Sequence, residues 1–165
     1  MYHLLYSFCE WLQNTQWALY ISGSTWIYPY VQMIHFTGLS LWVGTNLALD
    51  LSLLGVGRRR QTPGELSDSL FVWNWTGLGV AVTGGFMLFA TAATTFVINP
   101  AFRLKLGVLI PVALILHIIV QQKARTWGQT MDTPPIAKLA GLTEILLWVG
   151  VATAAVSIPI YEHLG

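Results

Sequence analysis

The stretch "WIYPYVQMIHFTGLSLWVGTNLALDLSLLG", residues 26–55, is a long apolar run that contains one histidine, one asparagine and one aspartate. About 20 helical residues cross about 30 Å of hydrocarbon, so this run is long enough to span a membrane. Ser24 or Thr25 can cap its N-terminus, and Pro29 suits the first turn, where a missing N–H costs nothing. We therefore expect a membrane-spanning helix over residues 26–56.

The polar side chains of this helix fall on one face. At 100° per residue, Asn46 and Trp42 lie about 20° to either side of His35. Gln32 and Asp50 lie about 60° away from it. A charged side chain costs a few kcal/mol in hydrocarbon, so a face of this kind normally points into a bundle. The sequence thus predicts that this stripe contacts other helices and not lipid.

The composition agrees with a membrane location. Of 165 residues, 55% are hydrophobic and 9% are charged, whereas roughly a quarter are charged in a soluble domain. Cys9 is the one cysteine, which excludes a disulfide framework or a thiolate-built metal cluster within this chain. The formal net charge of +1 offers no basic footprint for nucleic acid. We expect the lipid bilayer, and not nucleic acid, to be the main partner.

The rest of the chain predicts three more spans and one surface helix. Residues 2–20 show a helical period with one apolar face but are too polar to span, so we expect a retained amphipathic helix in the membrane interface. Pro100 and Pro135 mark the starts of the last two spans, and Pro111 and Pro159 are expected to kink them. The predicted fold is one all-α membrane domain, a four-transmembrane-helix bundle with spans at residues 26–56, 70–98, 100–122 and 135–160.

Basic residues predict the orientation of these spans. Two of them, Arg103 and Lys105, lie near one side of the predicted bundle. Six flank the two loops on the other side: Arg58, Arg59, Arg60, Lys123, Arg125 and Lys138. Loops rich in Lys and Arg stay in the cytoplasm. Assuming a bacterial source, we expect an inner-membrane protein with its N- and C-termini in the periplasm.

Four polar residues are expected at a common depth. At 1.5 Å per residue, Asp50, His117 and Glu144 each lie about 9 to 12 Å from the cytoplasmic side, with Asn74 near the same level. Two carboxyls and an imidazole on three helices form either a satisfied hydrogen-bond network or a place where protons are taken up. The sequence leaves both interpretations open.

His35 and His117 are the histidines within the predicted spans, and they raise the hypothesis of a haem. Paired imidazoles on facing helices are the usual axial ligands of a b-type haem in a bundle. Helical rise places the two residues about 7 to 10 Å apart along the axis, so the pair only just reaches across an iron. We therefore predict non-covalent haem b with these two histidines as metal ligands.

Other residues extend the haem hypothesis. Gly38 and Gly44 lie on the same helix as His35 and would leave room for a porphyrin edge. Lys105 or Arg103 could face a haem propionate or a quinone headgroup. Covalent attachment is excluded because there is no Cys-x-x-Cys-His motif.

The order of motifs resembles a known family. "FCEWLQNT" at residues 8–15, the span quoted above and "NPAFRLKLG" at residues 99–107 are similar to small bacterial membrane proteins of a family of unknown function. The resemblance covers nearly the whole chain and implies four spans. More loosely, the chain is similar to four-helix membrane b-type cytochromes and copper-resistance membrane domains, in which His35 and His117 would match haem ligands. Two haems are not expected, because the spans lack a second histidine pair.

Three classes of function follow. The first is a haem b electron-transfer subunit that links quinol to a membrane or periplasmic redox partner. The second is a cofactor-free structural subunit of a larger membrane complex, and the third is a proton conduit or transporter that uses Asp50, His117 and Glu144. No soluble-enzyme motif is present, so any enzymatic role is at most that of a redox subunit.

Overall fold

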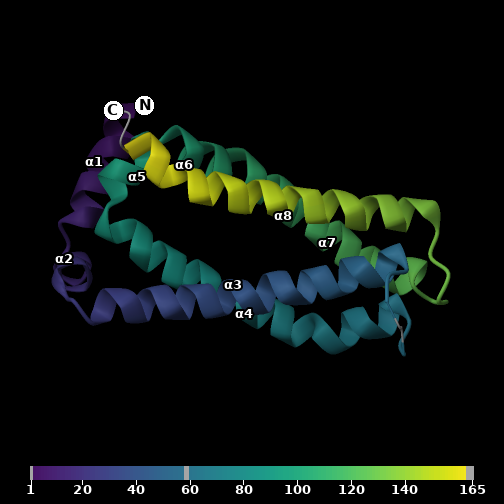
Figure 1. Ribbon diagram of the computed structural model, residues 1–165. Coiled ribbons are helices and arrows are strands. Elements are labelled where there is room, and N and C mark those ends of the chain that lie inside the picture. Colours follow the sequence, from purple (N-terminus) through teal and green to yellow (C-terminus); the bar gives the residue numbers. More distant parts are fainter. Residues whose placement is uncertain (1, 58–59, 163–165) are drawn as a thin grey trace.

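The computed structural model describes residues 2–57 and 60–162, and every regular element in these ranges is a helix. Long helices run along the molecule, and two short ones lie across one end, where α1 begins and α8 ends (Figure 1). The all-α prediction is confirmed for the described part of the chain. At the opposite end of the molecule, α3 ends and α4 begins near the end of α7 and the start of α8 (Figure 1).

The N-terminal region consists of two helices, α1 (Tyr2–Gln13) and α2 (Gln16–Gly23), and not of the single helix predicted over residues 2–20. At the break, Asn14 Nδ2 donates to the Glu10 carbonyl at 2.9 Å and Thr15 Oγ1 donates to the Leu12 carbonyl at 2.7 Å. Such local side-chain bonds compete with the backbone ladder and end a helix.

The next two helices form a long hairpin. α3 (Ile27–Leu54) ends at Gly55, whose φ of 82° is the left-handed conformation that glycine adopts easily. α4 (Pro63–Thr91) begins with a capping box, in which Thr62 and Glu65 each bond the other's backbone N–H. This box places the start of α4 well before the predicted residue 70.

Glycines bring α3 and α4 into backbone contact where they cross. A Cβ on Gly38 would lie 2.5 Å from the Ala81 nitrogen, and one on Gly77 would lie 2.8 Å from the Trp42 nitrogen. Only residues without a Cβ allow this distance, as in small-residue interfaces between membrane helices. Gly38 and Gly77 therefore belong to a helix-packing surface between α3 and α4.

The third long unit is not a uniform α-helix. After the short α5 (Ala93–Ile98), it consists of α6 (Pro100–Leu104), a π-helical turn η1 (Lys105–Leu109) and α7 (Ile110–Trp127). Pro111 has no N–H, and its ring would clash with the carbonyl of Gly107 in a regular α-helix, which a widened turn relieves. In contrast, α8 (Pro135–Glu162) continues as a helix through Pro159.

Within residues 2–57 and 60–162, two stretches are long and apolar enough to cross a membrane, Pro100–Trp127 and Pro135–Ile160. Among the described helices, α3 and α4 do not reach the same hydropathy. Their interior faces carry Asn46, Asp50 and Asn74, and α4 begins with charged residues. Length and composition therefore support two of the four predicted spans.

The interior is layered along the bundle. One apolar cluster joins α1 and α2 to α4 and α5, and a second lies toward the two loops at the other end. A third, made of Trp42, Ala113 and Trp148, lies on α3, α7 and α8. Polar side chains are buried in the same interior. The buried polar cluster consists of Thr45, Asn46, Asp50, Asn74, His117 and Glu144.

Candidate functional site

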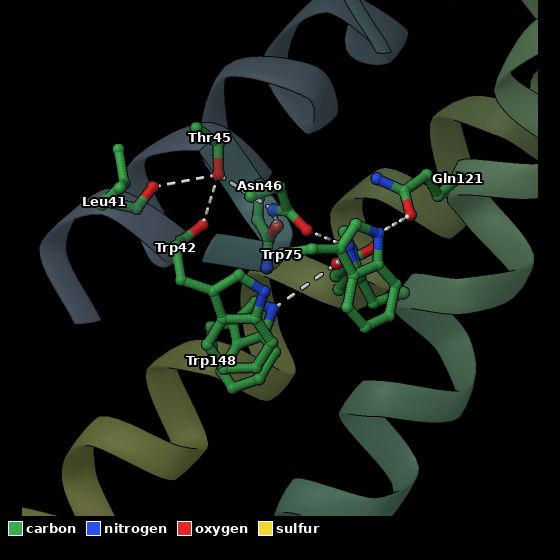
Figure 2. A network of polar contacts seen from close by, with 10 residues as sticks. Leu41, Trp42, Thr45, Asn46, Trp75, Gln121 and Trp148 are labelled. Carbon is green, nitrogen blue, oxygen red and sulfur yellow. Dashed lines mark hydrogen bonds and ion pairs between the residues drawn. The ribbon is translucent and has the colours of Figure 1, made fainter. Parts of the chain in front are cut away.

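The buried polar cluster starts at Thr45 on α3. The Thr45 hydroxyl lies 2.9 Å from the Leu41 carbonyl and 2.8 Å from the Trp42 carbonyl, so its hydrogen is donated to the backbone (Figure 2). Its oxygen is left to accept from Nδ2 of Asn74, at 2.9 Å. This contact fixes the orientation of the Asn74 amide, which turns its Oδ1 toward His117.

His117 on α7 is held from two sides. Its Nε2 lies 3.0 Å from Asn74 Oδ1, and its Nδ1 lies 2.6 Å from Glu144 Oε1 on α8. Nδ2 of Asn74 also donates to the side chain of Asn46, so both amide hydrogens of Asn74 are used. Because Asn74 Oδ1 can only accept, Nε2 of His117 carries a hydrogen. The nitrogen whose protonation can change is therefore Nδ1.

The contact between His117 and Glu144 holds one proton in either of two ways. The pair can be an imidazolium with a carboxylate, or a neutral imidazole with a carboxylic acid, and the proton count is the same in both. The two side chains are 1% and 0% exposed, so water does not compete for this proton in the described structure. A short hydrogen bond in such a poorly solvated place is strong and directional.

Several atoms beside this pair have no partner. Among the described residues, neither carboxyl oxygen of Asp50 accepts a hydrogen bond, and neither does Glu144 Oε2. The amide nitrogen of Asn46 and the indole nitrogen of Trp42 are unpartnered donors. Asp50 lies within electrostatic range of Glu144. A buried carboxylate without partners costs several kcal/mol, and a bound proton removes its charge.

A glycine lets α8 approach Asp50. A Cβ on Gly141 would lie 3.2 Å from the backbone oxygen of Asp50 and 3.6 Å from its Cβ. Glu144 follows Gly141 by three residues and therefore projects from nearly the same face of α8. This close packing explains why two carboxyl side chains from different helices share one interior.

Indole rings surround the imidazole. The Trp42 ring lies 4.4 Å from that of Trp148 and 6.3 Å, edge to face, from that of His117. The Trp75 ring lies 6.2 Å from the His117 ring, and its Nε1 donates to Gln121 at 2.8 Å. Figure 2 shows these indoles and the Gln121 side chain around the polar groups. They keep the dielectric around the proton low.

The predicted haem with both histidines as ligands does not fit this arrangement. Both ring nitrogens of His117 are engaged inside the cluster, and iron requires one nitrogen with a lone pair directed at the metal. His117 is a hydrogen-bonded interior residue in this structure.

His35 lies apart from the cluster, at the crossing of α3 and α4. Its Nδ1 is 2.7 Å from the Ala81 carbonyl, and a Cβ on Gly85 would lie 2.9 Å from its Cε1. The expectation that Gly38 leaves room for a porphyrin edge is wrong, because the backbone of α4 occupies that space. Gly44 has no neighbouring atom within 4 Å of an added Cβ and lies on the exposed side of α3.

The two basic residues of the third unit have different surroundings. Lys105 Nζ lies 5.5 Å from the centroid of the Phe102 ring. Arg103 lines an apolar groove between α1 and α6, whose lining includes neither His35 nor His117. The contacts given for these two cations involve neither His35 nor His117.

The structure brings together Asn74, His117 and Glu144, which the sequence predicts at a common depth. It adds four residues that were not predicted from the sequence: Thr45, Trp75, Gln121 and Trp148. Each of the four had a signal in its spacing. Thr45 and Trp75 adjoin polar residues of the cluster, whereas Gln121 and Trp148 follow such residues by one helical turn.

Comparison with known proteins adds a family but no activity. A model described as a family of unknown function, DUF6644, matches residues 8–160. No curated protein and no solved structure matches. The predicted resemblance to a family of unknown function is thus confirmed, whereas the looser similarity to b-type cytochromes has no support in these comparisons.

Proposed function

Because the chain belongs to the DUF6644 family, whose function is unknown, we propose its function from the geometry of its interior. It is an integral membrane subunit that binds and releases a proton at His117, Glu144 and Asp50. The observation that carries this proposal is the pair of contacts of His117, Nε2 with Asn74 Oδ1 and Nδ1 with Glu144 Oε1. The first contact requires a hydrogen on Nε2, so one proton is shared between Nδ1 and Glu144, beside the Asp50 carboxyl, whose oxygens have no partner.

The distribution of side chains supports four spans. On α3, Met33 is 62% exposed while Asp50 is 1% exposed, and on α4, Val72 is 68% exposed while Asn74 is 2% exposed. An exterior that is apolar around a polar interior is the arrangement expected in lipid. The helices are 28 and 29 residues long, or about 42 Å, which exceeds the hydrocarbon thickness.

Basic residues support one orientation. The backbone N–H of Gly64 donates to the Gly128 carbonyl at 3.1 Å. The start of α4 and the residue that follows α7 therefore meet at one end of the bundle. Of the basic residues near this end, Arg58 and Arg59 lie outside the described residues, and the others are Arg60, Lys123, Arg125 and Lys138. We place this end in the cytoplasm of a bacterial cell and the other end in the periplasm.

The geometry suggests how a proton would alter the bundle. Two carboxylates in a water-poor interior repel each other, so Asp50 and Glu144 hold at least one proton between them. Loss of the proton between Nδ1 and Glu144 leaves a lone pair of His117 facing a carboxylate, which weakens that contact. His117 is linked through Asn74 to Thr45, so a proton change on α8 is passed to α4 and α3. Protonation and helix packing are therefore coupled.

Infrared spectroscopy of the purified protein tests this proposal. Carboxylic acids absorb separately from carboxylates, and their band shifts in D2O. At neutral pH we expect a carboxylic-acid band in the wild-type protein that is reduced in Asp50→Asn and in Glu144→Gln. Asp68→Asn is the matched control, because Asp68 is exposed and paired with Arg125 at 2.7 Å, so it should not contribute to the band.

The opposite result has a clear meaning. If the wild-type spectrum contains no carboxylic-acid band at any pH at which the protein stays folded, neither Asp50 nor Glu144 holds a proton, which contradicts the proposed proton-binding carboxyl pair. The cofactor-free structural subunit would then be the better description. A band that survives in both cluster variants would place the proton on another carboxyl.

A second candidate keeps the haem, with His35 as its ligand and the opposite ligand supplied by another chain. The observation that favours it is the Nδ1 contact with the Ala81 carbonyl, which orients the ring and leaves Nε2 as the coordinating nitrogen. A carbonyl bonded to the far nitrogen is the common support of a metal-bound histidine. Haem would supply electron transfer, and quinol would be its electron donor.

A dithionite-reduced minus oxidised spectrum of the purified complex decides this second candidate. A b-type α band that disappears in His35→Ala and persists in His117→Ala would support it. A colourless preparation from haem-replete cells would exclude it and leave the proton-binding proposal untouched.

A further inference from the structure

We propose that the seam between α4 and α7 is the route by which water and protons reach His117, from the end of the bundle at which α4 begins and α7 ends. This inference rests on the proposed function and adds to it the side from which the proton is exchanged. His117 and Glu144 are 1% and 0% exposed, so their hydrogens exchange with water only when part of the bundle opens. The contacts around His117 single out one seam.

Polar side chains connect α4 with α7 from the surface inward. At the surface, Arg125 Nε donates to Asp68 Oδ1 at 2.7 Å, and the two side chains are 69% and 53% exposed. Further in, Trp75 Nε1 donates to Gln121 Oε1 at 2.8 Å (Figure 2). Both of these side chains are half-buried. Exposure therefore falls from the first contact to the second.

The innermost contact of the seam is the one between Asn74 Oδ1 and His117 Nε2, at 3.0 Å. On α7, the polar residues that face α4 are spaced by four: His117, Gln121 and Arg125. Residues at this spacing lie on one face of a helix, one turn apart. A continuous row of hydrogen-bonding groups thus leads from the exposed Arg125 to the buried imidazole.

Apolar clusters close the other approaches to His117 within the described part of the chain. The cluster toward the end of α7 joins α3, α7 and α8. The cluster of Trp42, Ala113 and Trp148 joins the same three helices on the other side of His117. Neither cluster contains a buried residue of α4. Water in a protein interior requires polar partners, so the seam between α4 and α7 is the favoured way in.

The hydrogen bond between Trp75 and Gln121 closes this seam. The Trp75 ring lies 6.2 Å from the His117 ring, so the bond stands directly in front of the imidazole. A bond of this kind is only slightly more stable than the same two groups bonded to water, so it opens readily. Water that enters meets His117 first and then Glu144, which lies 2.6 Å from Nδ1. A proton released by the pair leaves on this water as hydronium, and hydronium returns it.

Exchange of the His117 ring hydrogens with water measures this access. Full-length protein with nitrogen-15-labelled histidine rings is transferred in detergent from H2O to D2O, and NMR follows the loss of the N–H signal, assigned with His117→Gln. Trp75→Phe and Gln121→Leu should each speed the exchange roughly three- to tenfold, because each removes the closing hydrogen bond. The double variant should exchange no faster than the faster single variant, since both changes remove the same bond.

Trp42→Phe is the matched control. The Trp42 ring lies 6.3 Å from the His117 ring, nearly as close as that of Trp75, but it belongs to the apolar cluster on the other side. Its Nε1 has no partner among the described residues, so no closing bond is lost. This variant should exchange like the wild type. A wild-type rate in Trp75→Phe, or an equal acceleration in Trp42→Phe, would overturn the proposal.

The test of the route is separate from the test of proton binding. An imidazole carries at least one ring hydrogen whether it is neutral or protonated, so the exchange rate is measurable in either case. A missing carboxylic-acid band would contradict the proposed proton binding while the exchange rates still report on the seam. Unchanged rates would remove the route and leave the proton-binding cluster in place.

Discussion

At the scale of single residues, the side chain of His117 is held from several sides. Both its nitrogens are bound, three indole-bearing helices enclose it, and it is 1% exposed. Without the imidazole ring, Asn74 Oδ1 and Glu144 Oε1 stay buried but lose their hydrogen bonds to His117. Each buried group that loses its partner costs about 1 to 3 kcal/mol.

The variants His117→Ala and Asp50→Asn should therefore differ in stability. We expect His117→Ala to lower the free energy of unfolding by about 2 to 5 kcal/mol. Asp50→Asn should cost less than about 1 kcal/mol, because it replaces an unpartnered carboxyl by a neutral group of the same shape. Denaturant titration in detergent measures both. A larger loss for Asp50→Asn than for His117→Ala would mean that Asp50 is an ionised, bonded member of the network.

Cys9 allows a prediction about reactivity. Its side chain, on α1, is 1% exposed and packs against α4 and α5. Burial raises the pKa of its thiol. The thiolate is the reactive form, so less of it is present at neutral pH and its fraction grows as the pH rises. Maleimide should label Cys9 much more slowly in folded protein than in detergent-denatured protein.

The matched control for this labelling is Ser22→Cys in a Cys9→Ser background, since Ser22 is exposed on α2. Its thiol should react quickly in the folded protein. Equal rates for the two positions would show that α1 is not packed on the bundle.

The depth and direction of the buried polar side chains were predictable from the sequence, because the geometry of a single helix determines them. Helical rise put Asp50, Asn74, His117 and Glu144 at one level, and helical rotation put Asn46 on the interior stripe. The sequence did not indicate which nitrogen of His117 faces which partner. That depends on how four helices are rotated against each other, and the hydrogen bond that Asn74 Nδ2 donates to Thr45 Oγ1 fixes it.

At the scale of elements, the crossing of α3 and α4 determines how the bundle is built. Gly38 meets the backbone of α4 so closely that a methyl group cannot be added without moving a helix. Gly79 lies on the same hairpin but has no neighbour within 4 Å of an added Cβ. The two glycines form a matched pair for a packing test.

We expect Gly38→Ala to lower the free energy of unfolding by about 1 to 3 kcal/mol, the usual cost of overpacking. Gly79→Ala should be neutral or stabilising by up to about 1 kcal/mol, because alanine favours the helix. Thermal unfolding in detergent compares them. Equal behaviour of the two variants would contradict the close crossing.

Element boundaries were predicted less well than element types. The capping box at Thr62 and Glu65 starts α4 earlier than expected, because a polar first turn resembles a loop in hydropathy. The break at Asn14 and Thr15 depends on side-chain bonds to carbonyls, and the π-helical turn before Pro111 depends on relief of a ring clash. None of these features changes the apolar pattern from which the spans were predicted.

At the scale of the whole molecule, the proposed orientation can be tested with fusions. The basic residues near the α3–α4 and α7–α8 loops predict that those loops are cytoplasmic. A reporter that is active only in the periplasm should be active after Gly165 and silent at Gln61. The reverse pattern would invert the bundle, and activity at both positions would mean that fewer than four helices span.

The central claim is that His117 holds a fixed hydrogen on Nε2 and an exchangeable one at Nδ1, shared with Glu144. Nitrogen-15 NMR of ring-labelled histidine in the full-length protein measures both nitrogens directly, with His117→Gln to assign the signals. We predict that Nε2 stays protonated over the whole pH range in which the protein is folded, while the Nδ1 signal moves with pH and changes in Glu144→Gln. Nδ1 and Nε2 signals that are both independent of pH, or a bare Nε2, would contradict the claim.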